Sequence, residues 1–286
     1  MKQKLKFNRE SLVALAITGT VSQPGSGENV VDKEGRLHHI PGVGGITYNL
    51  KLGDSAYGWL GDHVEPEVSL ENRNKQASEA LNILACIGNE AVVTGGDAKG
   101  ETGYVIGRHS GAEHVMIHMR NEEALDRLMI GDPFRIRAQG AGTVIEGFEE
   151  LCVDCIDPEL LDKIACINED GLIEVPVAGT VPAALMGSGI GMKSYRGDYD
   201  MITQDMQRIR ALGLDKLRMG DIVLLEDCFN CFGRSVKRGA VSVGVVIHTD
   251  CFYPGHGPGI VNILSAPTKR IVGRKDEKCN IKDYME

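Results

Sequence analysis

Short apolar runs recur along the chain and are separated by turns rich in glycine. Runs of four to eight apolar or alternating residues, bounded by turn residues, are typical of β-strands. In the first half they predict strands over residues 91–94, 103–107, 114–119, 134–138 and 143–148. In the second half they predict strands over residues 172–178, 222–226, 240–247 and 260–264. The pattern therefore predicts a protein built from many short strands.

Helical periodicity is confined to a few segments. Residues 71–87 carry an apolar stripe that includes Ala77, Leu81 and Leu84, and shorter helices are predicted over 122–129, 158–166 and 203–212. These helices are too few and too short to cover both faces of a parallel sheet. We therefore expect a mainly β or α+β fold, with small barrel-like or sandwich subdomains and a few short helices.

One turn pattern occurs twice, 89 residues apart. Leu125-Asp-Arg-Leu-Met-Ile-Gly-Asp132 matches Leu214-Asp-Lys-Leu-Arg-Met-Gly-Asp221, and each run precedes a predicted strand. Glycine supplies a positive φ and aspartate bonds backbone amides in such turns. We interpret the chain as two β-rich halves, residues 1–140 and 141–286, although a turn shared without common ancestry explains the match almost as well.

Amino-acid composition and net charge limit the classes of protein to which the chain can belong. Glycine accounts for 36 of the 286 residues, about 13% against an average of roughly 7%, which fits many tight turns. The formal net charge is −9, the wrong sign for a general binder of nucleic acid. The basic N-terminus is followed by no apolar signal-peptide core, and no apolar run is long enough to cross a membrane. We expect a cytoplasmic protein without membrane association.

Two C-x-x-C pairs, Cys152/Cys155 and Cys228/Cys231, are the main cysteine pattern. Two such pairs could complete a tetrahedral zinc site. Both pairs lie beside apolar strand-like runs, however, where cysteine also serves as a small hydrophobic residue. In the cytoplasm we expect the eight cysteines to be thiols or ligands and not disulfides.

The richest chemical pattern lies in the hairpin from His248 to Gly259. His248 and Asp250 follow a long apolar strand, and His256 lies in the glycine-rich return loop. Imidazole and carboxylate groups together can bind a divalent metal or form a general acid–base pair. We therefore predict His248, Asp250 and His256 as catalytic residues, while a polar, solvated hairpin tip is the simpler alternative.

The same hairpin carries a candidate anion site. Gly255, Gly257 and Gly259 leave backbone amides unblocked, and Arg234, slightly upstream, could neutralise a carboxylate or phosphate. These four residues are the predicted substrate- or anion-binding groups.

Three further clusters contain potential metal ligands. Asp62 and His63, near the only tryptophan, are predicted as metal ligands. His109, His114 and His118 form a weaker candidate, because their alternation also fits an exposed strand face. Asp198 and Asp200 could hold a divalent cation, but two carboxylates in a glycine-containing loop are usually solvated.

Residues 91–106 resemble the short KOW motif of ribosomal and transcription-factor barrels. The resemblance depends on Gly95, Gly96, Lys99, Gly100 and Gly103. It implies an SH3-like barrel in the N-terminal half, and in that family the barrel often contacts RNA. Asp97 and Glu101 flank Lys99 here, so the resemblance indicates a barrel and not RNA binding.

The whole chain resembles the uncharacterised bacterial family DUF4438, a domain of unknown function. The resemblance is carried by Gly61-Asp-His-Val-Glu-Pro66, Gly95-Gly-Asp-Ala-Lys-Gly100, Arg196-Gly-Asp-Tyr-Asp200, Phe232-Gly-Arg-Ser235 and His256-Gly-Pro-Gly259. It implies a mainly β protein with several small subdomains, and it implies no activity. Cys228 and Cys231 are not part of that pattern, which weakens the zinc interpretation.

Two functional hypotheses follow from these patterns. The first is an enzyme, a hydrolase or isomerase that acts on a small anionic or amide-bearing metabolite through a His/Asp site. In that site His248 or His256 would be either a general base or a ligand of a divalent metal cofactor. The chain has no G-x-S-x-G motif and no strand–G-x-G-x-x-G–helix unit, which disfavours a serine hydrolase and a nicotinamide oxidoreductase. The alternative is a non-catalytic binding or assembly protein whose KOW-like barrel contacts protein or RNA. In either case we expect a homo-oligomer.

Overall fold

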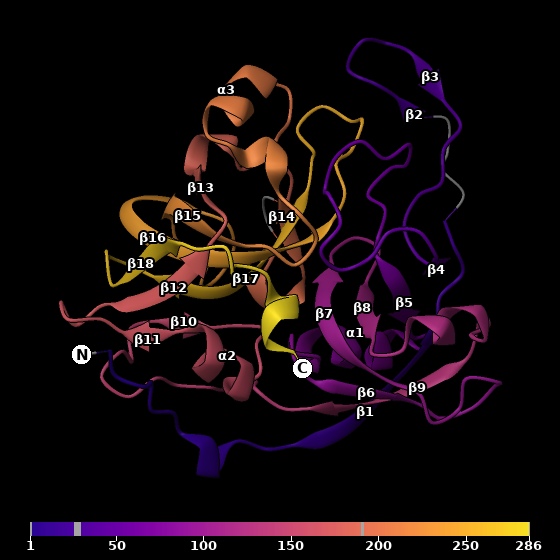
Figure 1. Cartoon of the computed structure of the whole chain (residues 1–286), viewed down its shortest axis with the longest axis horizontal. Helices are drawn as coiled ribbons and strands as arrows, with labels where there is room; N and C mark the ends of the chain where they lie inside the picture. The colour runs from indigo at the N-terminus through magenta and orange to yellow at the C-terminus, as the bar shows by residue number, and fades with distance from the viewer. Residues whose placement is uncertain (1, 26–29, 190–191, 286) are drawn as a thin grey trace.

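The first half of the chain folds into a closed β-barrel (Figure 1). The computed structural model describes residues 2–25, 30–189 and 192–285. Six antiparallel strands follow each other in the order β1-β9-β6-β7-β8-β5, and β5 pairs again with β1 to close the ring. The strands are β1 Leu15–Val21, β5 Glu67–Glu71, β6 Glu90–Val93, β7 Thr102–His109, β8 His114–Met119 and β9 Pro133–Ala138, with β4 Ile46–Thr47 added beside β5.

Apolar side chains fill the barrel, and α1 (Lys75–Leu84) packs on its outside against β1. Phe134, Ile136 and Ile117 are fully buried in the barrel core. The segment that resembles a KOW motif supplies the adjacent strands β6 and β7. The predicted barrel is therefore confirmed.

The second half is built on a six-stranded sheet. Its strands run in the order β10-β17-β16-β15-β13, and β14 pairs with residues 259–261 of β17 on the edge opposite β16. The strands are β10 Cys152–Val153, β13 Gly179–Pro182, β14 Asp198–Asp200, β15 Ile222–Cys228, β16 Val236–His248 and β17 Gly259–Ala266. A smaller sheet contains β11 Cys166–Ile167, β12 Ile173–Val177 and β18 Ile271–Lys275. The short helices α2 (Pro158–Ile164) and α3 (Met206–Ala211) complete this half, and the mainly β fold class is confirmed.

The repeated turn forms the same structure in both halves. Gly131 and Gly220 have φ values of 90° and 86°. The carboxylates of Asp132 and Asp221 each accept a backbone amide three residues earlier, at 2.9 Å in both cases. The turns lead into β9 and β15, so the predicted role of this pattern is confirmed.

Two predicted elements need correction. The strand predicted over 143–148 is wrong: this segment forms only a single bridge, between Ile145 and Phe7. Thr143 and Phe148 instead bond back to Gly140 and Ile145, so their backbone amides are used in local turns. The helix predicted over 71–87 is shorter, because β5 extends to Glu71 and the side chain of Asn74 caps α1.

The cysteine expectation is also wrong. Cys152 and Cys231, one from each C-x-x-C pair, form a disulfide, while Cys155 and Cys228 are buried thiols. Both bridged cysteines lie next to Ser265 of β17: Cys152 is paired with it in the sheet, and the Cys231 sulfur lies 3.8 Å from its carbonyl oxygen. The pairing of β10 with β17 and the course of the loop after β15, which the cysteine spacing does not reveal, bring the two sulfurs together.

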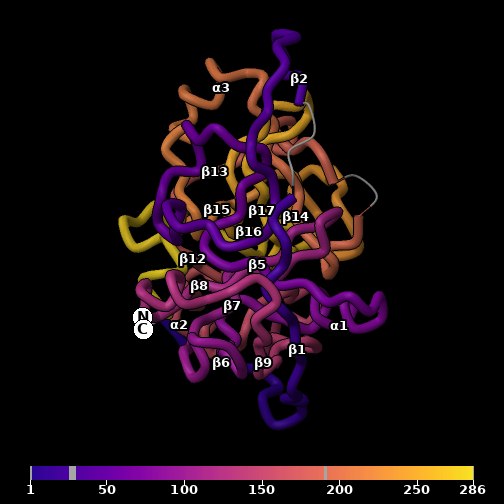
Figure 2. Tube along the Cα trace, turned by 90° about the vertical axis from the view of Figure 1, so that its right-hand side faces the viewer, coloured from indigo at the N-terminus to yellow at the C-terminus, as the bar shows by residue number. Residues whose placement is uncertain are grey.

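The segment between β1 and β5 leaves the barrel and runs over the C-terminal half (Figure 2). It carries the small hairpin of β2 (Val30–Val31) and β3 (Leu37–His38). Backbone bonds fasten it to the loop after β16, with Thr249 donating to Val64 and Asp250 donating to Ala56. This crossing places residues 56–64 beside the end of the C-terminal sheet. No helix in the described ranges is long and apolar enough to cross a membrane.

Candidate metal centre

The C-terminal sheet supplies three side chains from the two strands that flank β17, namely β16 and β14. His248 ends β16, while Asp198 and Asp200 lie on β14, and Gly259 of β17 pairs with both His248 and Asp200. His248 Nε2 lies 3.0 Å from Asp198 Oδ2 and 3.5 Å from Asp200 Oδ1. A Cβ on Gly259 would lie only 2.1 Å from His248 Nε2 and 2.4 Å from Asp198 Oδ2. Because Gly259 has no Cβ, the imidazole of His248 and the carboxylate of Asp198 have room to come together.

The barrel supplies His109, the last residue of β7. Gly107 lets β7 approach β16 closely, since a Cβ there would lie 2.4 Å from the side chain of Ile247. This contact brings the rings of His109 and His248 to a centroid distance of 4.4 Å. Ser110, the next residue, donates its amide to Asp198 Oδ1 at 2.8 Å and fixes that carboxylate with Oδ2 facing His248.

Two more histidines come from loops on the more open side of the cluster. His63 has a positive φ of 54° and lies in the segment that crosses from the barrel. Its Nε2 lies 3.1 Å from His256 Nδ1 and 3.4 Å from Asp200 Oδ2. His256 Nδ1 lies 2.7 Å from the same Asp200 oxygen, and its side chain is 34% exposed. His256 therefore marks the solvent side of the cluster.

Three of the four rings are oriented by an oxygen at Nδ1. That oxygen is Asp62 Oδ1 for His63, Glu65 Oε1 for His109 and the Thr249 carbonyl for His248, at 3.2, 2.5 and 2.8 Å. A partner on one ring nitrogen sets the tautomer and leaves the other nitrogen as the ligand atom, as in metal-binding histidines. The Nε2 atoms of these rings are thus the ones available to a cation.

Glu65 is the most deeply buried of these orienting groups. Its carboxylate lies against His109 and His114 and also accepts the Gly44 amide at 2.9 Å. Burial opposes ionisation, but the charges and hydrogen bonds of the two imidazoles outweigh it and hold the pKa of Glu65 well below its usual value. His114 therefore supports the cluster through Glu65 and does not face the exterior, so the exposed-face interpretation of β8 is wrong.

The electrostatic environment of the cluster favours the charged forms of His248 and Asp200. Burial alone would lower the pKa of His248, but hydrogen bonds and charges from Asp198 and Asp200 raise it well above the usual value. Burial would likewise raise the pKa of Asp200, yet its bonds to three histidines hold it well below the usual range. Without a cation, His248 serves as the positive partner of these buried carboxylates.

Donor atoms close enough to share one cation occur in three overlapping groups. The members are His109, Asp198 and His248; His63, Asp200 and His248; and His63, Cys251 and His256, with their donor atoms within 4.8 Å of one another. Imidazole nitrogen and carboxylate oxygen suit zinc and other divalent first-row metals. The arrangement can therefore bind a divalent cation. Within the described residues, no such group includes a cysteine of the C-x-x-C pairs.

The structure brings together four of the predicted site residues. His248, His256, Asp62 and His63 all come together in the cluster described above. Asp250 turns away from it: its carboxylate accepts from Thr203 Oγ1 at 2.9 Å and from the Cys251 amide at 2.8 Å.

The predicted anion-binding residues differ in their surroundings. Arg234 donates to the carbonyl of Met186 and, within the described residues, makes no hydrogen bond or ion pair with the cluster. Gly257 and Gly259 are buried against protein atoms, and Gly255, with a φ of 84°, is partly exposed.

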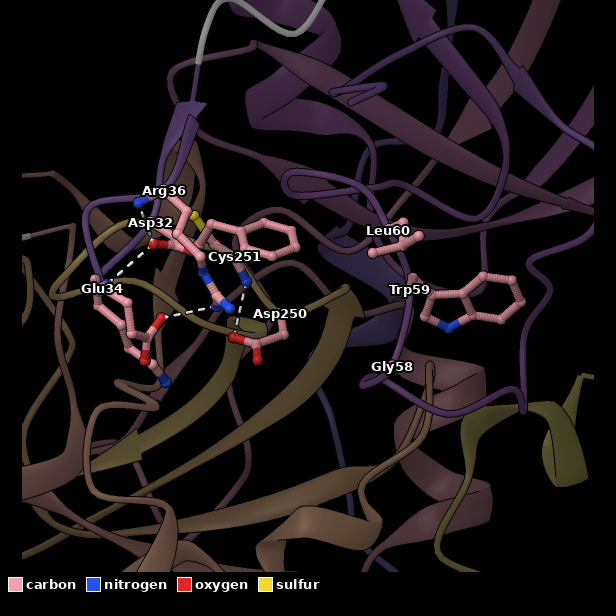
Figure 3. A pocket seen from close by; sticks show the side chains of 10 residues that line it. Asp32, Glu34, Arg36, Gly58, Trp59, Leu60, Asp250 and Cys251 are labelled. Carbon is pink, nitrogen blue, oxygen red and sulfur yellow. Dashed lines mark hydrogen bonds and ion pairs between the residues drawn. The ribbon is translucent and has the colours of Figure 1, made fainter. Parts of the chain in front are cut away.

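A cavity of about 400 Å³ lies beside the cluster (Figure 3). Cys251 joins the two, because it lines the cavity and its thiol lies 2.8 Å from Asp62 Oδ1. Arg36, paired with Asp32 and Glu34, contributes to one wall, and Trp59 contributes apolar surface. Asp250 also lines this cavity.

Sequence reasoning left His109, Asp198 and Asp200 out of the predicted site. Asp198 and Asp200 are only 3% and 5% exposed, although a solvated loop was the expectation. One signal was present in the sequence: Asp198-Tyr-Asp200 alternates polar and apolar residues, which is typical of a strand with both carboxylates on one face. Nothing local indicates that His109 lies beside His248.

Replacing Glu65 with glutamine tests its orienting role. We expect Glu65→Gln to weaken binding of Zn²⁺ by roughly 10–100-fold, because His109 loses the carboxylate that holds its ring. Competition with a fluorescent zinc chelator measures the change. Glu67→Gln is the matched control, since Glu67 is also buried but contacts His118 and the Met119 amide. Equal effects of both substitutions would contradict the role assigned to Glu65.

Comparison with known proteins places the chain in a family. The profile for the N-terminal part of the domain of unknown function DUF4438 matches residues 29–162, and the profile for its C-terminal part matches residues 163–285. The crystal structure of TM1086 is similar over 99% of this chain and 100% of that one, with 42% sequence identity and a TM-score of 0.94. No curated protein matches the chain. The chain belongs to the DUF4438 family.

Proposed function

We propose that this protein is a divalent-metal-dependent hydrolase that acts on a small polar metabolite with an ester or amide bond. The observation that supports the proposal most strongly is the convergence of three oriented histidines on two buried aspartates. Perturbed, buried titratable groups of this kind are concentrated at functional sites.

The protein groups would hold the cation and keep one side open. His109, Asp198 and His248 are buried and would bind it from the protein interior. A bound divalent cation supplies Lewis-acid polarisation of a carbonyl and lowers the pKa of water to about 7 in favourable sites. His256 lies on the exposed side, where a substrate would approach.

The neighbouring cavity would accommodate the part of the substrate that does not react. Its volume of about 400 Å³ falls in the range of small-molecule sites. Lys33 and Arg36 bring cationic groups to its wall beside the carboxylates of Asp32, Glu34 and Asp250, while Trp59 and Phe252 bring aromatic surface. This mixture of charged and aromatic groups suits a small polar molecule.

A metal-reconstitution assay tests the proposal. The metal-free protein is loaded with Zn²⁺ or Mn²⁺ and offered nitrophenyl esters, nitrophenyl phosphates and amino-acid nitroanilides. We expect the loaded protein to hydrolyse at least one class, chelation to remove the activity, and added metal to restore it. His248→Ala should be inactive, whereas His39→Ala, at an exposed histidine, should match the unmodified protein. Metal binding with no hydrolysis of any class would overturn the hydrolase assignment.

A further inference from the structure

We infer that the centre holds two divalent cations and that the carboxylate of Asp200 bridges them. The role of the second ion rests on the proposed function. The pair of ions itself is supported by the division of the donor atoms into groups, by the number of those atoms and by the charge around them.

The donor atoms form an inner and an outer group, and a third group, made of His63, Asp200 and His248, overlaps both. His109, Asp198 and His248 make the inner group, and all three are buried. The outer group consists of His63, His256 and Cys251, which come from loops nearer to solvent. Within the described residues, no set of donor atoms lying within 4.8 Å of one another combines the whole inner group with the whole outer group.

Asp200 presents one oxygen to each group. Its Oδ1 lies 3.5 Å from His248 Nε2, on the inner side. Its Oδ2 lies 2.7 Å from His256 Nδ1 and 3.4 Å from His63 Nε2, on the outer side. A carboxylate shared in this way is suited to the spacing of roughly 3.5–4 Å between the ions of two-metal sites.

The charge of the surrounding protein matches two dications. Four carboxylates line or support the cluster, namely Asp62, Glu65, Asp198 and Asp200. When ionised they carry a total charge of −4, and Cys251 would add −1 if it binds the outer cation as a thiolate. The protein charge is therefore sufficient to balance two divalent cations.

The two sites differ in burial, so the two ions should differ in exchange. His248 is fully buried, and His109 is oriented by the buried carboxylate of Glu65. His256 is partly exposed and, within the described residues, its Nε2 makes no hydrogen bond. The outer ion should therefore leave first when the protein is dialysed against a chelator.

Metal stoichiometry and electron paramagnetic resonance with Mn²⁺ test the inference. We expect the metal-free protein, without an affinity tag, to bind two Mn²⁺ per chain and to show the spectrum of an exchange-coupled pair. His256→Ala should bind one Mn²⁺ and show the spectrum of an isolated ion. His39→Ala controls for surface histidines and should still bind two. Circular dichroism verifies that each variant is folded.

The outcomes separate this inference from the proposed function. One Mn²⁺ per chain at saturation, or two ions without exchange coupling, would overturn the bridged pair while leaving metal-dependent hydrolysis intact. Two coupled ions in a protein that hydrolyses no substrate class would support the pair and overturn the proposed function.

Discussion

Replacing Gly259 with alanine is expected to abolish metal binding even though every candidate ligand remains in place. The new methyl group would lie 2.1 Å from His248 Nε2 and 2.4 Å from Asp198 Oδ2. Both groups are held by other bonds, His248 to the Thr249 carbonyl and Asp198 to Ser110, so neither can move aside easily. The loss of affinity should exceed the roughly 10–100-fold that follows from losing an outer-shell partner.

Isothermal titration of the metal-free protein with Zn²⁺ measures this effect. Gly179→Ala is the control, because Gly179 also lies in a strand and its added Cβ would meet only the end of the Leu214 side chain, at 2.9 Å. That variant should bind Zn²⁺ like the unmodified protein. If Gly259→Ala retained full affinity, the cation site could not lie between His248 and Asp198.

Replacing Arg108 with alanine is expected to cause the largest loss of stability. Arg108 is only 1% exposed, and its guanidinium donates to the carbonyls of Asn82 and Ser194 at 2.8 and 3.0 Å. These bonds join the barrel, α1 and the segment that leads into β14. Truncation would leave buried carbonyls unpaired and open a cavity, and we expect the free energy of unfolding to fall by roughly 3–5 kcal/mol.

Urea denaturation followed by circular dichroism measures this change. Arg274→Ala is the control, since Arg274 is about half exposed and its pairs with Glu174 and Asp276 lie at the surface. Exposed ion pairs contribute about 0–1 kcal/mol. A loss below about 1 kcal/mol for Arg108→Ala would show that the buried guanidinium does not stabilise the junction.

Local patterns in the sequence predicted much of the secondary structure. The repeated turn, with glycine and aspartate at fixed positions, was predicted correctly because its hydrogen bonds are made within four residues. The strand predicted over 143–148 failed for the opposite reason. Ile145 and Phe148 are buried by long-range packing, while the backbone around them forms turns, and apolar residues alone do not distinguish these cases.

The site was predictable only in part. His248 and His256 lie on one hairpin, so the sequence predicted that they lie close together and close to Asp250. The carboxylates that do face these histidines come from β14, whose pairing with β17 is not encoded in any short motif. His109 joins them because Gly107 lets β7 pack on β16, and that contact depends on the tertiary structure.

The proposed ligands come from both sides of the boundary at residues 162–163. His63 and His109 belong to the N-terminal profile, whereas Asp198, Asp200, His248 and His256 belong to the C-terminal one. A bound cation would then stabilise the arrangement in which the two halves are packed together, because it binds only when both are folded and in contact. Neither part contains all the proposed ligands. If evolution separated the two parts, each should therefore lack a complete metal site.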